Sequence, residues 1–92
     1  MTWLFEWDDA KDALNRVKHG VGFDEAQRAF LDRRRVIAVD EAHSAKEPRW
    51  FCLGIVNGRV MTVRFTTRGN TIRIIGAGYW RKGRDAYERE NA

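Results

Sequence analysis

The spacing of hydrophobic residues changes along the chain, and each change of period predicts a new element of secondary structure. Leu14 and Val17 follow Ala10 at helical spacing, whereas Val63 and Phe65 alternate with polar residues. The expected elements, in order, are a strand at 4–7, helices at 9–18 and 23–32, strands at 36–39, 50–56, 59–67 and 71–77, and a helix at 81–90. This order predicts an α+β fold with helices packed on an antiparallel sheet.

Residues with strong conformational preferences mark the ends of these elements. Asp8-Asp9 precedes the first helix, where acidic side chains favour the positive end of the helix dipole. Lys18-His19 gives the same helix a basic end, and Gly20 supplies a left-handed residue that stops it. Asn57-Gly58 is typical of a two-residue hairpin turn. We therefore expect a helical hairpin followed by a meander of strands.

Composition says little about this fold, but it bears on the number of domains, on membrane contact and on the cellular location. No repeat or linker interrupts the chain, and Pro48 is its only proline, so residues 1–92 are expected to form one small domain. No apolar run approaches the roughly 18 residues of a membrane span, and the start of the chain lacks a signal-peptide pattern. We expect a soluble cytoplasmic protein without membrane contact. Cys52, the single cysteine, lies in an apolar run and predicts neither a disulfide nor a zinc site.

Charge is distributed unevenly along the chain. The formal net charge is +4, of which residues 1–58 contribute −1 and residues 59–92 contribute +5. A basic surface formed by the last third suits a polyanion, because each neutralised phosphate releases counterions. It equally suits an acidic protein partner, and charge alone does not separate the two.

Neither metal catalysis nor a covalent nucleophile is indicated by the residues. The acidic residues that precede and begin the first helix, Glu6, Asp8, Asp9 and Asp12, are better explained by helix capping than by metal binding. No serine nucleophile pattern is present, so we expect no metal and no cofactor. RNA cleavage needs neither, because the 2′-hydroxyl of the substrate can attack the adjacent phosphorus with help from cations and proton carriers.

Several residues suit such chemistry, and each also has a structural interpretation. Arg64 and Arg73 lie in mid-strand, where they either face water or bind phosphate. His43 is either a substrate-facing or a solvated loop histidine, and His19 either completes a helix end or transfers protons. Trp80 either packs in the core or stacks on a base.

The sequence as a whole resembles the BrnT family of toxins from type II toxin-antitoxin systems. The matching residues are Phe5-Glu6-Trp7-Asp8, Lys11, Asn15, Lys18-His19-Gly20-Val21, Phe23, Ala26, Phe30, Asp40, His43-Ser44, Arg49, Gly58-Arg59, Thr67-Arg68-Gly69, Ile72-Arg73-Ile74-Ile75, Ala77 and Tyr87-Glu88. The resemblance implies a RelE-like ribonuclease fold and RNA cleavage that halts translation. It also implies a BrnA-type ribbon-helix-helix antitoxin, through which the operator DNA of the operon is bound.

Site residues can be assigned on this resemblance. It implies that Arg64, Arg68 and Arg73 contact phosphate and that Arg81 and Tyr87 are the arginine and tyrosine near the C-terminal end of RelE-like enzymes. The candidate catalytic residues are thus His43, Arg64, Arg73, Arg81 and Tyr87, and the candidate substrate-binding residues are Lys18, His19, Arg59, Arg68, Trp80 and Lys82. We expect guanidinium groups of the last third to converge over a phosphodiester.

One departure from the family pattern leaves other functions open. Family members read Ile-Ser-Ala-Arg where this chain reads Ile75-Gly76-Ala77-Gly78, so a hydroxyl and a cation are missing. Arg81 or Lys82 is the replacement we expect for that cation. The alternatives are a catalytically weakened module that binds the antitoxin and regulates the operon, and a nucleic-acid-binding domain unrelated to toxins.

Overall fold

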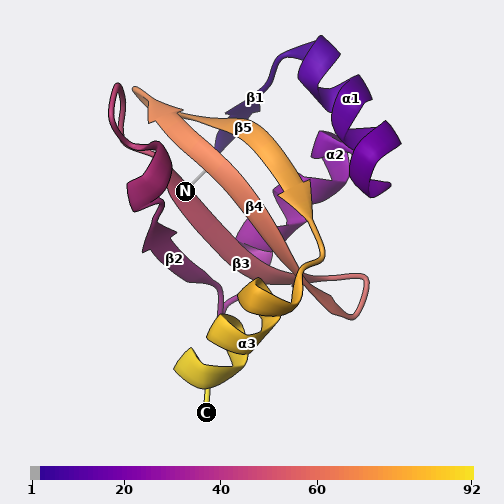
Figure 1. Ribbon diagram of the computed structural model, residues 1–92, viewed down its shortest axis with the longest axis vertical. Helices are drawn as coiled ribbons and strands as arrows, with labels where there is room; N and C mark the ends of the chain where they lie inside the picture. The colour runs from indigo at the N-terminus through magenta and orange to yellow at the C-terminus, as the bar shows by residue number, and fades with distance from the viewer. Residues whose placement is uncertain (1–2) are drawn as a thin grey trace.

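A five-stranded sheet, with strand order β1-β5-β4-β3-β2, organises the protein in a computed structural model that describes residues 3–92 (Figure 1). Its strands are β1 (Leu4–Glu6), β2 (Val36–Val39), β3 (Trp50–Val56), β4 (Arg59–Arg68) and β5 (Thr71–Gly78). The helices are α1 (Asp9–His19), α2 (Phe23–Ala26) and α3 (Arg81–Glu90), together with the short 3-10 helices η1 (Gln27–Leu31) and η2 (Glu41–His43). The predicted α+β class and element order are confirmed.

The sheet is mixed, not wholly antiparallel as predicted. Strands β2 to β5 form the expected antiparallel meander, but β1 lies beside β5 and runs parallel to it. Neighbouring parallel strands require a long crossover between them. Here residues 7–70, about two thirds of the chain, separate the two strands, so local sequence patterns do not reveal their pairing.

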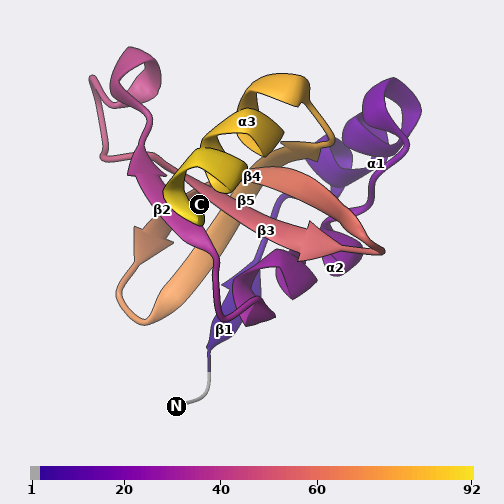
Figure 2. The same cartoon turned by 90° about the horizontal axis from the view of Figure 1, so that it is seen from below.

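Each face of the sheet has its own hydrophobic core. One core contains Phe23, Phe30, Met61 and Val63, where α1, α2 and η1 cover the sheet. The other is smaller and packs Leu53, Val60 and Tyr87 beneath α3. Figure 2 shows α3 and α2 on opposite faces. In this three-layer arrangement α3 is the only α-helix among the described residues that packs on its face of the sheet.

The predicted ends of the first helix and the predicted hairpin turn are confirmed. The carboxylate of Asp8 accepts hydrogen bonds from the backbone N–H groups of Ala10 and Lys11 and so caps α1. Gly20 ends that helix with φ at 69°. Asn57 and Gly58 also have positive φ angles, 54° and 78°, as a tight hairpin turn requires.

The second helix is shorter than predicted. Only Phe23–Ala26 is α-helical, and Gln27–Leu31 winds into the tighter η1. This segment presses on β3 at Gly54, where an added Cβ would lie 2.2 Å from the carbonyl oxygen of Ala29. Packing against the strand thus accompanies the change of helix type, and it depends on a residue far from the helix in sequence.

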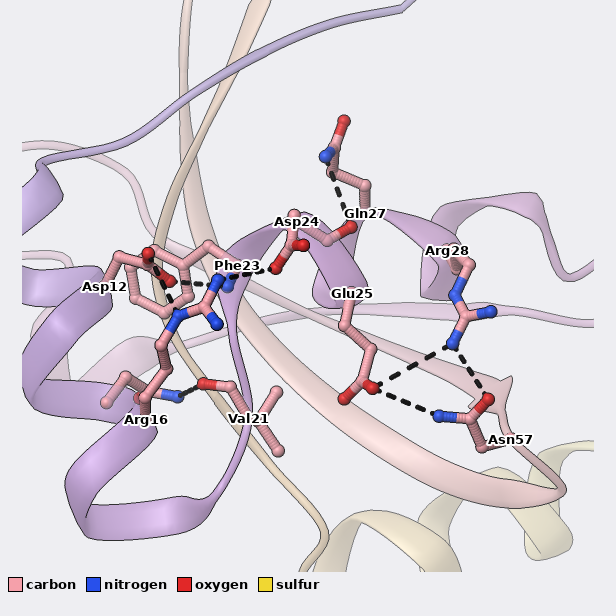
Figure 3. Close-up of polar contacts among 10 residues, drawn as sticks. Asp12, Arg16, Val21, Phe23, Asp24, Glu25, Gln27, Arg28 and Asn57 are labelled. Atoms are coloured by element: carbon pink, nitrogen blue, oxygen red, sulfur yellow. Dashed lines mark hydrogen bonds and ion pairs between the residues drawn. The ribbon is translucent and has the colours of Figure 1, made fainter.

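Hydrogen bonds lock the corner between α1 and α2. The carboxylate of Asp12 accepts the backbone N–H of Phe23 at 2.8 Å and also pairs with Arg16, which reaches Asp24 at 3.0 Å (Figure 3). Buried Asn15 donates to the carbonyl groups of Val21, at 2.8 Å, and Ala77, at 2.9 Å. Lys18-His19-Gly20 is therefore first a helix end, which the Asn15 contacts fix against β5.

Candidate functional site

Helix α3 covers only part of its face of the sheet and leaves an open face beyond it (Figure 1). Val60 and Thr62 of β4 lie under α3, and by strand alternation Arg64, Thr66 and Arg68 continue the same row away from it. We call the surface around Arg64, Arg68 and Arg73, which α3 does not cover, the open face; within it Thr66 is buried, and its hydroxyl donates to the carbonyl oxygen of Pro48 at 2.7 Å. The alternation predicted from sequence for β4 is confirmed here.

Arg64 is the central cation of the open face. It is partly buried, and its guanidinium makes no hydrogen bond or ion pair with any described residue. An irregularity in the β4–β5 register sets Gly76 opposite Arg64 and leaves Ile75 without a partner. A Cβ at Gly76 would lie 3.5 Å from Nε and Nη2 of Arg64. The guanidinium thus lies over the glycine, unpaired.

Arg73 lies on the same face, one strand away. It pairs with Thr66 in the β4–β5 register, and its guanidinium donates to the carboxylate of Glu6 at 2.6 Å. The Arg73 side chain is 26% exposed and that of Glu6 is 39% exposed. Glu6 is a functional candidate that the sequence interpretation treated only as part of a helix cap, because the β1–β5 pairing that places it was not foreseen.

A groove of about 520 Å³, the α3 groove, runs between α3 and the open face. Its walls are mainly apolar, and its residues are Ala38, Phe51, Leu53, Thr62, Arg64, Trp80, Lys82, Gly83 and Ala86. The cross-strand register aligns Ala38, Phe51 and Arg64 in one row of its floor. The α3 groove therefore joins three predicted site residues: Arg64, Trp80 and Lys82.

Trp80 directly precedes α3 and lines the α3 groove. Its ring covers Gly78, where an added Cβ would lie 2.6 Å from the indole. His19 meets the same ring edge to face, with centroids 5.0 Å apart. The structure thus brings the two predicted residues together, and the missing side chain at position 78 coincides with the space that Trp80 fills.

His43 lies in η2, which follows the edge strand β2, two strands from β4. Its Nδ1 lies 3.0 Å from the carboxylate of Asp40, which is almost fully buried. The hydroxyl of Ser44 donates to the Asp40 carbonyl oxygen and also contacts Arg49. These bonds fix the orientation of the imidazole, while 52% of the His43 side chain remains exposed.

Other predicted residues lie on a different surface. Arg59 and Arg81 line a separate pocket of about 360 Å³ together with Arg84. The guanidinium of Arg59 stacks over the ring of Tyr79 at 4.1 Å. Apart from Arg89, in the last turn of α3, the guanidinium groups of the last third therefore divide between two surfaces: Arg64, Arg68 and Arg73 lie on one, and Arg59, Arg81 and Arg84 lie on the other.

Tyr87 faces inward and supports the fold. It is buried, and its hydroxyl donates to the carboxylate of Asp32 at 2.6 Å. Burial and this hydrogen bond raise the pKa of Tyr87 to about 12. Partial burial alone raises the pKa of Asp32, but hydrogen bonds from Tyr87 and from the backbone of Ile55 and Arg34 outweigh it and lower that pKa. The pair attaches α3 to the segment before β2.

The remaining polar candidates occupy the periphery. Arg68 approaches Glu47 at 3.9 Å, and Lys18 is exposed at the end of α1. Burial raises the pKa of Cys52 to about 12, which makes it a poor nucleophile. Within residues 3–92, no three metal-ligating side chains gather at one place, and no helix is long and apolar enough to cross a membrane.

Comparison with known proteins identifies the family. A family model described as a ribonuclease toxin, BrnT, of type II toxin-antitoxin systems matches residues 7–83. The match includes α1, the complete meander and the start of α3, and therefore the strand arginines, His43 and Trp80. The search of curated proteins gave no match for the chain. The chain belongs to the BrnT family of ribonuclease toxins.

Proposed function

We propose that this protein cleaves RNA on its open face by metal-independent attack of a 2′-hydroxyl group, and so inhibits translation. Membership in a type II toxin-antitoxin family implies an RNA target and an antitoxin partner. The observation that carries the proposal is Arg64, a partly buried cation with no partner among the described residues. Such a group is ready to stabilise a phosphate on which negative charge develops.

The reaction assigns a task to each kind of group on this face. A base removes the proton of the 2′-hydroxyl, the oxygen attacks phosphorus, and the 5′-oxygen leaves with a proton from an acid. The products are a 2′,3′-cyclic phosphate and a 5′-hydroxyl. Arg64 and Arg73 hold the phosphate and stabilise its equatorial oxygens. Glu6, held by Arg73, is the proton carrier beside the two arginines, and His43, oriented by Asp40 at the opposite edge of the sheet, is the alternative carrier.

The partners follow from the family. We propose a BrnA-type ribbon-helix-helix antitoxin that neutralises the toxin, with operator DNA bound only through that antitoxin. The setting is the cytoplasm, where translating ribosomes are found, and residues 1–92 act as one toxin domain. No cofactor enters the proposed reaction, because the arginines supply the positive charge that a metal ion would otherwise provide.

Arg64→Ala tests the site directly. We expect the rate of RNA cleavage to fall about 100-fold or more, because a preorganised cation is lost from the transition state. The protein is freed from its co-purified antitoxin and assayed in excess EDTA, with the cyclic phosphate detected by mass spectrometry. Arg33→Ala is the matched control, since Arg33 is exposed and lies outside the site. Equal rates for both variants would exclude Arg64 from the reaction.

A second candidate function is favoured by Gly76 and Gly78. The chain lacks the hydroxyl and the cation of the family pattern at these positions, so it could bind the antitoxin and regulate the operon with little turnover. In that case the wild-type protein would form the antitoxin complex but give no cyclic phosphate. The EDTA assay of the freed wild-type protein therefore decides between the two functions.

A further inference from the structure

We propose that the pocket lined by Arg59, Arg81 and Arg84, the arginine pocket, is a second phosphate-binding subsite for single-stranded RNA. It shares Trp80 with the α3 groove, which contains Arg64. This inference rests on the proposed RNA substrate and extends it, because it predicts that the protein holds the strand away from the point of cleavage. Arg84 is not part of the sequence-based candidate site.

The arginine pocket is built to carry positive charge. Three guanidinium groups line about 360 Å³, with Glu88 as the only carboxylate among the lining residues. Arg59 is held against Tyr79, whose hydroxyl donates to the carbonyl oxygen of Val56 at 3.2 Å. Arg81 makes no hydrogen bond or ion pair with described residues, and Arg84 has only Asp85, at 3.8 Å. The pocket therefore has exposed guanidinium N–H groups that no described residue occupies and that an anion can bind.

The hairpin that supplies Arg59 is held in place. Asn57, at its turn, accepts a hydrogen bond from Arg28 at 2.8 Å and donates to the carboxylate of Glu25 at 3.1 Å (Figure 3). These contacts connect the turn to α2 and η1. Arg59 begins β4 directly after this fixed turn, so its backbone is already ordered near α3. Less conformational entropy is therefore lost when the arginines bind a ligand.

Trp80 connects the arginine pocket to the proposed cleavage site. Its side chain lines both the arginine pocket and the α3 groove, and 41% of the residue is exposed. An aromatic ring between two groups of cations matches the alternation of bases and phosphates along a single strand. A strand crossing Trp80 would stack one base there and place phosphates near Arg64 and Arg84.

This arrangement favours RNA over an acidic protein segment. Carboxylates of a peptide would pair with the arginines but would place no ring on the exposed part of the Trp80 indole. Guanidinium groups bind phosphate oxygens in a bidentate manner, and the ring accepts any base. The subsite should therefore raise affinity for a strand long enough to cross Trp80, with no base specificity of its own.

Binding of a non-cleavable strand tests the subsite. The probe is a labelled 2′-O-methyl RNA of about twelve nucleotides, which lacks the attacking hydroxyl, and the measurement is fluorescence anisotropy with the full chain. Arg84→Ala should weaken binding about tenfold and reduce the slope of log Kd against log salt by about 0.7. Arg89→Ala, which removes an exposed arginine from the last turn of α3, is the matched control and should bind as the wild type does.

Two further probes define the ligand. A 2′-O-methyl dinucleotide is too short to span both sites, so Arg84→Ala should not change its binding at Arg64. Equal loss of twelve-nucleotide binding in Arg84→Ala and Arg89→Ala would overturn the subsite. So would a polyglutamate peptide whose binding is as tight and equally dependent on Arg84, because the pocket would then recognise acidic protein.

The binding assay is independent of turnover. If the wild-type protein cleaves no RNA but Arg84→Ala still weakens binding of the long probe, the nuclease proposal fails and the subsite stands. If cleavage occurs and Arg84→Ala binds normally, the subsite fails alone.

Discussion

At the scale of single residues, Gly78 and Trp80 form one feature. The ring of Trp80 occupies the space next to Gly78 that any side chain there would enter. The missing cation of the family pattern cannot be restored without moving the tryptophan. Gly76 differs, because the nearest atoms to a new Cβ are those of Arg64 at an ordinary contact distance. A side chain can therefore be added at Gly76 with little movement of its neighbours, whereas a side chain at Gly78 must displace Trp80.

Substitution of each glycine tests this difference. We expect Gly76→Ser to change the free energy of unfolding by less than about 0.5 kcal/mol, because its side chain has room. Gly78→Arg should displace the ring of Trp80 and shift its indole N–H resonance in NMR spectra, assigned by its loss in Trp80→Phe. An unshifted Trp80 resonance in Gly78→Arg would contradict the close packing of the two residues.

At the scale of elements, α3 depends on a tyrosine that we had predicted to be catalytic. Tyr87 sits in the smaller core, and its hydroxyl bonds to Asp32 from the segment before β2. Asn91 adds hydrogen bonds to the backbone and side chain of Arg34. These contacts set the position of α3, and with it one wall of the α3 groove and one wall of the arginine pocket.

Removal of the Tyr87 hydroxyl tests how much its hydrogen bond to Asp32 stabilises the fold. Tyr87→Phe should lower the free energy of unfolding by about 1.5 kcal/mol, because a hydrogen bond to a carboxylate is lost. Because its pKa is lowered in the folded protein, the Asp32 carboxylate contributes fully to the free energy of unfolding above the ordinary pKa of 3.8. This contribution is lost as the pH falls through the lowered pKa of the folded state. Because its pKa is raised in the folded protein, the Tyr87 hydroxyl contributes fully to the free energy of unfolding below the ordinary tyrosine pKa of 10.0. This contribution is lost as the pH rises through the pKa of about 12 in the folded state.

Urea unfolding across this pH range provides the measurement. The difference between wild type and Tyr87→Phe should be constant from about pH 5 to 9 and shrink outside it. Tyr79→Phe is the control, since the Tyr79 hydroxyl bonds a backbone carbonyl that does not titrate. A Tyr87→Phe difference that persists unchanged in acid would show that Asp32 is not the partner in solution.

Sequence patterns predicted the elements well because their signals are local. Asp8, Gly20 and Asn57-Gly58 act on their own neighbours, and all appear where they were expected. The misses depend on tertiary contacts. Packing of Ala29 on Gly54 accompanies the short α2, and pairing of β1 with β5 makes the sheet mixed.

The candidate site was only partly predictable for the same reason. Strand alternation correctly placed Arg64 on the face opposite the larger core. It could not show that Arg81 would point to another pocket, because the position of α3 depends on Tyr87 and Asp32. Glu6 acquired its place beside Arg73 through the same unforeseen parallel pairing.

At the scale of the whole molecule, two glycines allow close packing on the two faces of the sheet. A Cβ at Gly54 would meet the backbone of Ala29 at 2.2 Å, and one at Gly83 would meet the hydroxyl oxygen of Thr62 at 2.0 Å. The helices on each side therefore approach the same sheet more closely than any side chain would permit. Both layers should contribute to one cooperative structure.

Alanine at either position should destabilise the entire domain. We expect Gly54→Ala and Gly83→Ala each to lower the free energy of unfolding by about 1–3 kcal/mol, because the layers must move apart. Tryptophan fluorescence and far-UV circular dichroism should report one coincident transition in urea. Gly76→Ala, with its ordinary 3.5 Å contact, is the control. Separate transitions for the two signals would show that the layers unfold independently.

The parallel pairing of β1 with β5 also determines when the open face is assembled. Glu6 and Arg73 are 67 positions apart, so the open face stays incomplete while the chain is being synthesised. Nearly all of the polypeptide must leave the ribosome before its first strand can find its neighbour. The open face, and with it the proposed cleavage site, is therefore assembled only when synthesis of the chain is almost finished.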